Sequence, residues 1–291
     1  MQNYKIIIKA LRLTILLVLL LVFALSFSMR SRFERTASAA APTFTVINTN
    51  GSGSGSLRQA MLDANASPGT DIIVFSIGTG PQTINISGAS LPVVTDPVVI
   101  DGTTQPGFSG KPIIEINGFS AGNSIPECPI SGLYIVAGDS IVRGLVINRF
   151  ATSGIWLEGK GGNTIQSNYI GPDINGTTRL GYSSTGINIY SSNNLIGGTT
   201  PEARNIISGH NSLGINVFGK NVTGNRIQGN YIGTNADGNA IIGNNSAGIS
   251  IGVSPGISSA EHSWAHGNEQ MIKNYVRQQG TIEGQGQLDL F

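Results

Sequence analysis

Charged residues and cysteines are both scarce in this sequence. Only 11% of its 291 residues are charged, against about 25% in typical soluble domains. The single cysteine, Cys128, excludes an intramolecular disulfide, so packing and backbone pairing must stabilise the chain. The net charge of +1 gives no general attraction to nucleic acid or to an anionic membrane. The three histidines share no zinc-ligand spacing, and no Ser-His-Asp constellation is visible.

Glycine and regularly spaced apolar residues are abundant instead. Glycine supplies 40 residues, and apolar types make up 40% of the chain. Together with the low charge, this composition predicts many short strands joined by polar turns. The regular spacing of the apolar residues argues against disorder. No glycine-rich phosphate loop follows a strand and opens a helix, and no basic stripe interleaved with aromatics predicts nucleic-acid binding.

Residues 1–41 form a separate N-terminal unit. A basic start with Lys5 and Lys9 precedes an apolar run over 13–27, and the Ala-Ser-Ala segment at 37–39 offers a small-residue cleavage site. This order is typical of a secretory signal peptide. The alternative is an N-terminal membrane anchor that stays uncleaved, although the apolar run is shorter than the ~20 residues that a comfortable span needs. Both alternatives predict that the remainder is extracellular or at the cell surface.

Two short phrases recur along the middle of the chain. The first is Gly-Ile-x-Ile or a close variant, at 154–157, 186–189, 214–217 and 248–251, with a weaker copy at 132–135. The second begins with Asn-x-Ile and ends with Asn-Tyr-Ile-Gly, at 163–171 and 225–233. The offsets between copies indicate turns of about 31 residues, a period typical of solenoids. In such folds each repeat buries its apolar face against the next one.

Each Gly-Ile-x-Ile phrase alternates apolar and polar residues, which is the periodicity of a strand. The inward positions are expected to stack in two ladders, Ile155 with Ile187, Ile215 and Ile249, and Leu157 with Ile189, Val217 and Ile251. Asn163, Asn194 and Asn225 fall at equivalent corners, where stacked amides can hydrogen-bond from turn to turn. The sequence therefore predicts an all-β fold in which residues 71–253 form a parallel β-helix, a solenoid of stacked strands.

Both ends of such a column expose apolar residues and unpaired backbone, so caps are expected. Residues 42–70 are interpreted as an N-terminal cap, because Ser56 to Gln59 has the pattern of a capping box at the start of a short helix. The apolar residues of that helix share one face: Leu57, Ala60, Met61 and Ala64. The repeat stops after Val253. Residues 254–291 are a non-repeat tail, either a C-terminal cap or disordered.

Three further segments carry distinctive motifs: Gly55 to Ala60 followed by Ala64-Asn65, Val99 to Gly107, and Val142 to Phe150. Together with the two repeated phrases, they resemble large bacterial surface proteins with right-handed parallel β-helix repeats. The resemblance covers roughly 44–253. It implies a right-handed parallel β-helix of the pectate-lyase-like type, and it implies export. It implies no single activity, and members often belong to longer multidomain chains.

Outward positions of the first phrase form two columns on one outer face of the predicted solenoid. They are Trp156, Asn188, Asn216 and Ser250, and then Glu158, Tyr190, Phe218 and Gly252. Trp156, Tyr190 and Phe218 offer flat apolar surfaces. The amides of Asn188 and Asn216 offer donors and acceptors. Since sugar rings stack on aromatics and bind amides, these five residues are candidates for binding polysaccharide or a cell-surface glycan. The alternative is that the aromatic residues only cover the sheet.

Catalysis on this scaffold would need charged side chains stacked on one face. Hydrolysis normally needs two carboxyl groups, and lyase chemistry needs a base with a cation held by carboxylates. Glu158 is the only acid in the two columns, so it is interpreted first as a solvated surface residue. It is kept as the one catalytic candidate because loops between strands can bring Asp173, Arg179 or Asp237 close to it.

Two loops carry side-chain oxygens that suit Ca²⁺, Asp173 with Asn175 and Asn235 with Asp237. The same residue types also form turns without a metal. No cofactor is predicted, and Ca²⁺ in these loops is kept as the alternative to plain turns.

The preferred prediction is a secreted or cell-surface module with a structural, adhesive or glycan-binding role and no evident catalytic site. It includes no nucleic-acid partner, and membrane contact only through an uncleaved N-terminal segment. One alternative is a polysaccharide lyase or glycoside hydrolase that acts in a groove on the outer sheet. The other is a fragment of a larger multidomain surface protein.

Overall fold

The computed structural model describes residues 40–122, 130–181 and 185–252. The chain divides into two compact units, Met1–Ala41 and Pro42–Phe291, and all described strands and helices belong to the second. The predicted signal or anchor at 1–41 lies outside the described residues except for its last two, and the predicted tail at 254–291 lies wholly outside them. Within the described ranges, no helix has the length and apolar character needed to span a membrane.

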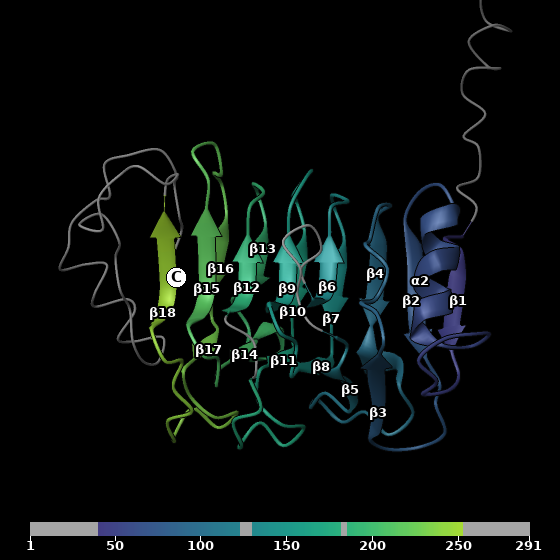
Figure 1. The fold of residues 1–291 in the computed structure, drawn as a ribbon, viewed down its shortest axis with the longest axis horizontal. Helices are drawn as coiled ribbons and strands as arrows, with labels where there is room; N and C mark the ends of the chain where they lie inside the picture. The colour runs from purple at the N-terminus through teal and green to yellow at the C-terminus, as the bar shows by residue number, and fades with distance from the viewer. Residues whose placement is uncertain (1–39, 123–129, 182–184, 253–291) are drawn as a thin grey trace, which may run out of the picture. The chain divides into compact units, whose positions relative to one another are not determined.

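Three parallel sheets make up most of the second unit (Figure 1). Sheet A contains, in spatial order, β1 (Thr43–Val46), β2 (Asp71–Phe75), β4 (Val98–Asp101), β7 (Ile141–Arg143), β10 (Thr164–Gln166), β13 (Leu195–Gly197) and β16 (Arg226–Gln228). Sheet B contains β3 (Gln82–Ser87), β5 (Ile114–Ser120), β8 (Leu145–Asn148), β11 (Tyr169–Ile170), β14 (Ile206–Ile207) and β17 (Tyr231–Ile232). Sheet C contains β6 (Ser131–Ile135), β9 (Ser153–Leu157), β12 (Thr185–Ile189), β15 (Leu213–Phe218) and β18 (Ala247–Gly252).

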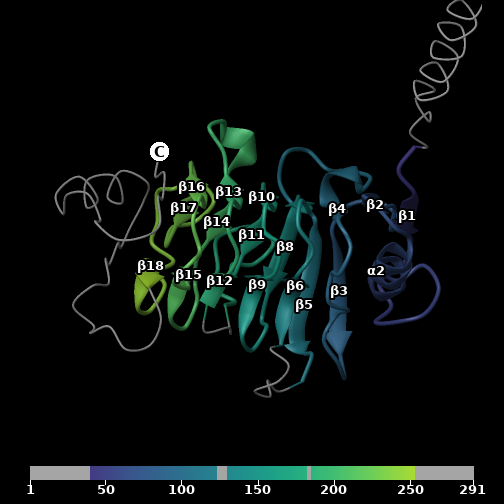
Figure 2. The same ribbon diagram turned by 90° about the horizontal axis from the view of Figure 1, so that it is seen from above.

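The chain visits the three sheets in a fixed order. It passes through β4, β5 and β6, then through β7, β8 and β9, and continues in this way to β16, β17 and β18. Each interior strand pairs in parallel with the equivalent strands of the turns before and after it, and a strand at the end of a sheet pairs on one side only. Figure 2 shows these turns in succession from above. This arrangement is compatible with a β-helix-like solenoid, and the predicted repeat and all-β class are confirmed.

The predicted ladders are present on sheet C. Ile187 pairs with Ile155 on one side and with Ile215 on the other, and Ile189 lies between Leu157 and Val217. All six side chains belong to one buried core. Burying such an aliphatic side chain contributes about 1.5–3 kcal/mol, so the short strands are stable only because they stack.

The glycine that opens each phrase is required by close packing. A Cβ atom at Gly154 would lie 2.5 Å from the Ile170 Cγ2 atom of sheet B and 3.0 Å from the Gly186 carbonyl oxygen of the next turn. Both distances are too short for a side chain, so only glycine lets sheets B and C approach each other here.

The N-terminal helix is confirmed as α2 (Leu57–Ala66). Its first turn is capped by the Ser56 hydroxyl, which accepts a hydrogen bond from the Gln59 N–H at 3.2 Å. The capping box is only half formed, because the Gln59 side chain donates to Asp63 instead of returning to Ser56. The predicted apolar face is buried in the core: Leu57, Ala60, Met61 and Ala64.

Arg58 ties this helix to two neighbouring loops. Its guanidinium donates to the carbonyl oxygens of Gly51 at 2.9 Å, Ser90 at 2.5 Å and Ala89 at 2.8 Å. Asn65, one residue before the end of the helix, donates to the Val93 carbonyl at 2.7 Å. The motif that resembles the surface-protein family thus holds the first helix against the following turn.

Buried asparagines form two ladders at the corners. In the predicted ladder, Asn163 donates its side-chain amide to Asn194 Oδ1 at 3.0 Å, and Asn194 donates to Asn225 Oδ1 at 2.8 Å. The backbone N–H groups of Asn163 and Asn194 donate to the same oxygens. A second ladder, which the sequence did not predict, joins equivalent corners of sheet B: Asn168, Asn205 and Asn230.

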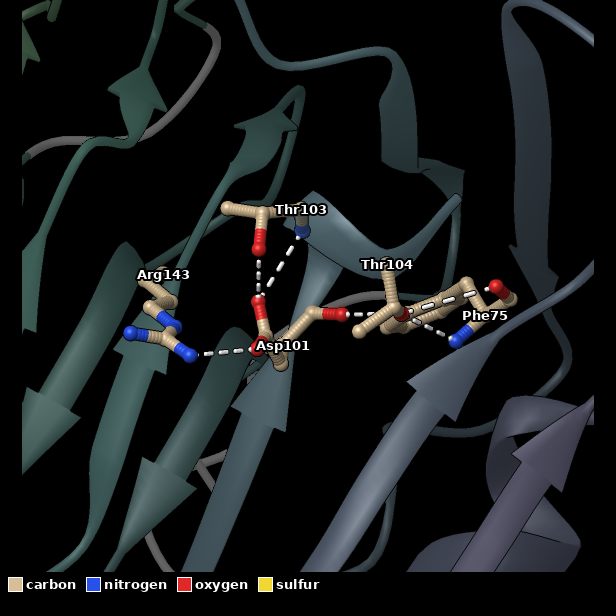
Figure 3. A network of polar contacts seen from close by, with 5 residues as sticks. All are labelled: Phe75, Asp101, Thr103, Thr104 and Arg143. Atoms are coloured by element: carbon tan, nitrogen blue, oxygen red, sulfur yellow. Dashed lines mark hydrogen bonds and ion pairs between the residues drawn. The ribbon is translucent and has the colours of Figure 1, made fainter. Parts of the chain in front are cut away.

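A polar network fixes the corner that follows β4 (Figure 3). Asp101 accepts hydrogen bonds from the Thr103 N–H and hydroxyl, and it forms an ion pair with Arg143 at 2.6 Å. Thr104 reaches back one turn and accepts from the Phe75 N–H at 2.8 Å. Burial opposes ionisation of Asp101, but the hydrogen bonds from Arg143 and Thr103 and the positive charge of Arg143 outweigh it and lower the carboxyl pKa. These contacts give the acidic residue of this motif a structural role.

Candidate functional site

Four aromatic side chains form a continuous row on the outer face of sheet C. We call Tyr134, Trp156, Tyr190 and Phe218 the aromatic row. Tyr134 lies on β6, Trp156 on β9, Tyr190 directly after β12, and Phe218 ends β15. The ring centroids of successive members are 5.9, 4.8 and 5.9 Å apart. The row therefore crosses four neighbouring turns without a break.

Strand alternation explains why these rings meet. In β9 the side chains of Ile155 and Leu157 are buried in the core, so Trp156 between them faces outward. Its ring stacks on Tyr190 at an interplanar angle of 18°, and their 4.8 Å spacing equals the usual strand separation of about 4.8 Å. Each aromatic pair adds about 0.5–1.5 kcal/mol beyond its buried area. The row therefore also stabilises the sheet.

Ring orientation determines which surfaces remain for a ligand. Trp156 and Tyr190 each turn one ring face toward the other. The two outer members are tilted with respect to them, Tyr134 by 60° and Phe218 by 67°. All four side chains are partly exposed. A ligand lying along the row would therefore meet rings in more than one orientation.

Glu158 is held by two members of the row. Its Oε2 atom accepts hydrogen bonds from the Tyr134 hydroxyl at 2.6 Å and from the Trp156 indole N–H at 3.1 Å. Both polar groups that these rings carry are thereby directed to one carboxylate oxygen, which fixes the orientation of the rings.

The two candidate amides lie beside the row. Asn188 pairs in register with Trp156 and Asn216, and the Asn216 amide donates to Asn188 Oδ1 at 3.1 Å. Asn188 is only 5% exposed, so it is less accessible than its outward position predicts. Within the described residues, Asn216 Oδ1 and the Tyr190 hydroxyl have no hydrogen-bond partner. They remain able to bind a ligand hydroxyl.

Tyr190 acts as a donor at neutral pH. Its burial and the nearby charge of Glu158 both raise the pKa of its hydroxyl above the usual 10.0. The proton is therefore retained across the physiological range.

All five predicted binding residues thus lie on one face and form one cluster. Tyr134 was missed, although it occupies the third position of the weaker phrase at 132–135, the same position as Trp156. That shared position was the signal that would have included it.

The structure gives the catalytic candidates different partners. Glu158 remains the only acidic residue among the described members of the two outward columns. Arg179 does not engage it, because its guanidinium donates to Asn245 at 2.6 Å and to Asn211 at 2.8 Å. The two-carboxylate arrangement that hydrolysis requires is therefore not supplied by these columns.

In each of the two candidate calcium loops, a side-chain oxygen accepts hydrogen bonds from backbone N–H groups of the same loop. Asp173 Oδ1 accepts from the backbone N–H groups of Thr177 and Thr178, each at 2.8 Å, and Asn235 Oδ1 accepts from those of Asn239 and Ala240. Burial opposes ionisation of Asp173, but the backbone hydrogen bonds outweigh it and lower the carboxyl pKa.

The companions of these two residues are exposed. Asn175 donates to Asp173 Oδ2 at 3.2 Å, and Asp237 lies near Tyr169. Among the residues that the structure describes, no three His, Cys, Asp or Glu side chains gather as a metal site would require. Ca²⁺ binding stays a prediction, and the observed contacts are those of turns.

No protein-family model matches the chain, and a search of curated proteins finds no match to it. Function must therefore be inferred from the fold and from the geometry of sheet C.

Proposed function

We propose that the three sheets form a right-handed parallel β-helix, and that the chain is a secreted or cell-surface module that binds a glycan along sheet C. The handedness is expected because connections between parallel strands of one sheet are nearly always right-handed. Export is expected from the N-terminal signal pattern at 1–41. Adhesion or a spacer role is compatible with the same scaffold.

The observation that carries the proposal is the unbroken aromatic row across four turns. The Asn216 amide oxygen beside the row and the Tyr190 hydroxyl within it have no hydrogen-bond partner in the described part of the chain. Sugar rings present apolar C–H faces and hydroxyl groups together, which suits aromatic surfaces flanked by hydrogen-bonding groups. A chain of sugars lying along the row would contact successive turns of the solenoid. The alternative, lyase or hydrolase activity, is less favoured because Glu158 already accepts two hydrogen bonds from the row.

The test is retention of the purified chain on a panel of plant and microbial polysaccharides, with and without Ca²⁺. Phe218→Ala and Asn216→Ala are expected to weaken binding about tenfold each, the effect of removing a contact worth about 1.4 kcal/mol. Phe119→Ala is the matched control, because Phe119 is 72% exposed and belongs to sheet B.

Two results would count against the proposal. If no polysaccharide is retained by folded protein, or if Phe119→Ala is as damaging as Phe218→Ala, the row is not a glycan site. Release of reducing ends or of unsaturated sugars during the incubation would favour the enzymatic alternative.

A further inference from the structure

The aromatic row carries a charge that its hydrogen bonds do not neutralise. Glu158 is partly buried against Tyr134 and Trp156, and within the described residues it forms no ion pair. Its two hydrogen-bond donors are a neutral hydroxyl and a neutral indole. Among the described residues, the carboxylate therefore has no cation paired with it on the proposed binding face.

That charge acts beyond its own turn. The raised pKa of the Tyr190 hydroxyl arises from burial and then from the charge of Glu158, although Tyr190 belongs to the next turn. Lys160, two residues after Glu158, and Lys220, in the turn that follows β15, are both exposed. Exposed cations are screened by water and salt more strongly than a carboxylate packed against two rings.

We propose that Glu158 makes the sheet C face select neutral glycans and reject polysaccharides that carry carboxylate or sulfate groups. This inference rests on the proposed glycan-binding function. A glycan seated on the row would exclude water from around Glu158, which strengthens repulsion of any anionic group of the ligand. Repulsion of the wrong ligand is a general source of specificity. Glu158 is then a specificity-determining residue instead of a catalytic one.

The decisive variant is Glu158→Gln, which removes the charge and keeps an oxygen that can accept from Tyr134 and Trp156. Binding is measured with a neutral β-glucan and with a carboxymethylated form of the same glucan, at low and at high salt. Asp237→Asn is the matched control, because it changes net charge equally in an exposed loop beyond sheet B.

The wild-type chain is expected to bind the neutral glucan more tightly than the charged one. Glu158→Gln is expected to raise affinity for the carboxymethylated form about fivefold at low salt, the effect of one unit charge in a largely aqueous setting. The decisive quantity is the ratio of the two affinities, charged over neutral, because any shift of the rings affects both glucans, and the rise in this ratio should shrink at high salt.

Preference of the wild type for the charged glucan, or equal gains from Glu158→Gln and Asp237→Asn, would overturn the inference and leave glycan binding intact. Failure of the folded wild type to retain either glucan or any member of the polysaccharide panel would instead refute the proposed function, and this inference with it.

Discussion

Acidification from neutral pH to about pH 4 is predicted to weaken the fold through His210. This side chain is 1% exposed and lies at the corner that follows β14, with its Nε2 atom 3.0 Å from the Ile170 carbonyl oxygen. Since a carbonyl only accepts, the ring donates from Nε2. The ring fills the space opposite Gly171 and Gly186, where any Cβ atom would lie less than 3 Å from it.

The magnitude follows from the pKa of the imidazole. Burial lowers it from 6.5 to about 4, and the nearby charge of Arg179 acts in the same direction, against the hydrogen bond to Ile170. Between these two pH values the unfolded chain binds a proton that the folded chain does not bind. The contribution of the neutral ring is therefore complete above pH 6.5 and is lost as the pH falls toward 4. At about 1.4 kcal/mol per pKa unit, the loss is about 3 kcal/mol.

The assay is urea unfolding of wild type and His210→Gln at several pH values across this window. The wild-type free energy of unfolding should fall by about 3 kcal/mol relative to the variant, which cannot titrate. Any contribution of His262 and His266 cancels because both chains carry them. The pKa values of Asp101 and Asp173 are lowered in the folded chain, so their contributions begin to fall at the acidic end of this window, and they cancel because both chains carry them.

Parallel curves for wild type and variant would refute the reasoning. If the variant does not fold, NMR titration of the His210 ring in the wild type decides instead, because a midpoint near 6.5 would show that burial does not lower the pKa.

Two further predictions concern the corners of the turns. Asn194→Ala should lower the free energy of unfolding in urea by about 3 kcal/mol, because it leaves buried donors of Asn163 without an acceptor. The control, Asn221→Ala at an exposed position, should change it by less than about 0.5 kcal/mol. In thermal unfolding, Gly171→Ala should lower the free energy of unfolding by about 3 kcal/mol more than Gly233→Ala does. Both glycines have positive φ, but a Cβ at Gly171 would lie 2.0 Å from the Ser208 oxygen, whereas among the described residues nothing lies within 4 Å at Gly233. Equal effects within either pair would contradict the corresponding prediction.

The repeat was predictable wherever its spacing is constant. Asn163, Asn194 and Asn225 are separated by 31 residues at each step, so their ladder follows from the sequence alone. The second ladder was not predicted because its spacing in sequence is unequal: Asn205 lies 37 residues after Asn168 and 25 before Asn230. The longer first interval contains the loop with the 3-10 helix η2 (Pro201–Ala203). Constant geometry in space does not require constant spacing in sequence when loops absorb the difference.

The candidate site was predictable in its membership but not in its contacts. Strand alternation places Trp156 and Asn216 on one face, and the sequence contains that information. It does not contain the direction in which the Trp156 ring leans, which depends on Glu158 accepting from the indole and on Tyr190 in the next turn. It also did not indicate that Asn188 would be nearly buried.

The asparagine ladders have a direction, and this has a consequence for synthesis of the chain. In both ladders the side-chain donor belongs to the earlier turn and the acceptor oxygen to the later one, as from Asn163 to Asn194 and from Asn168 to Asn205. A ribosome releases the earlier turn first. In the nascent chain, the hydrogen bonds that each corner donates to the later asparagine therefore form only when the following turn arrives. Completion of the column thus proceeds one way, with every new turn closing the corner made before it.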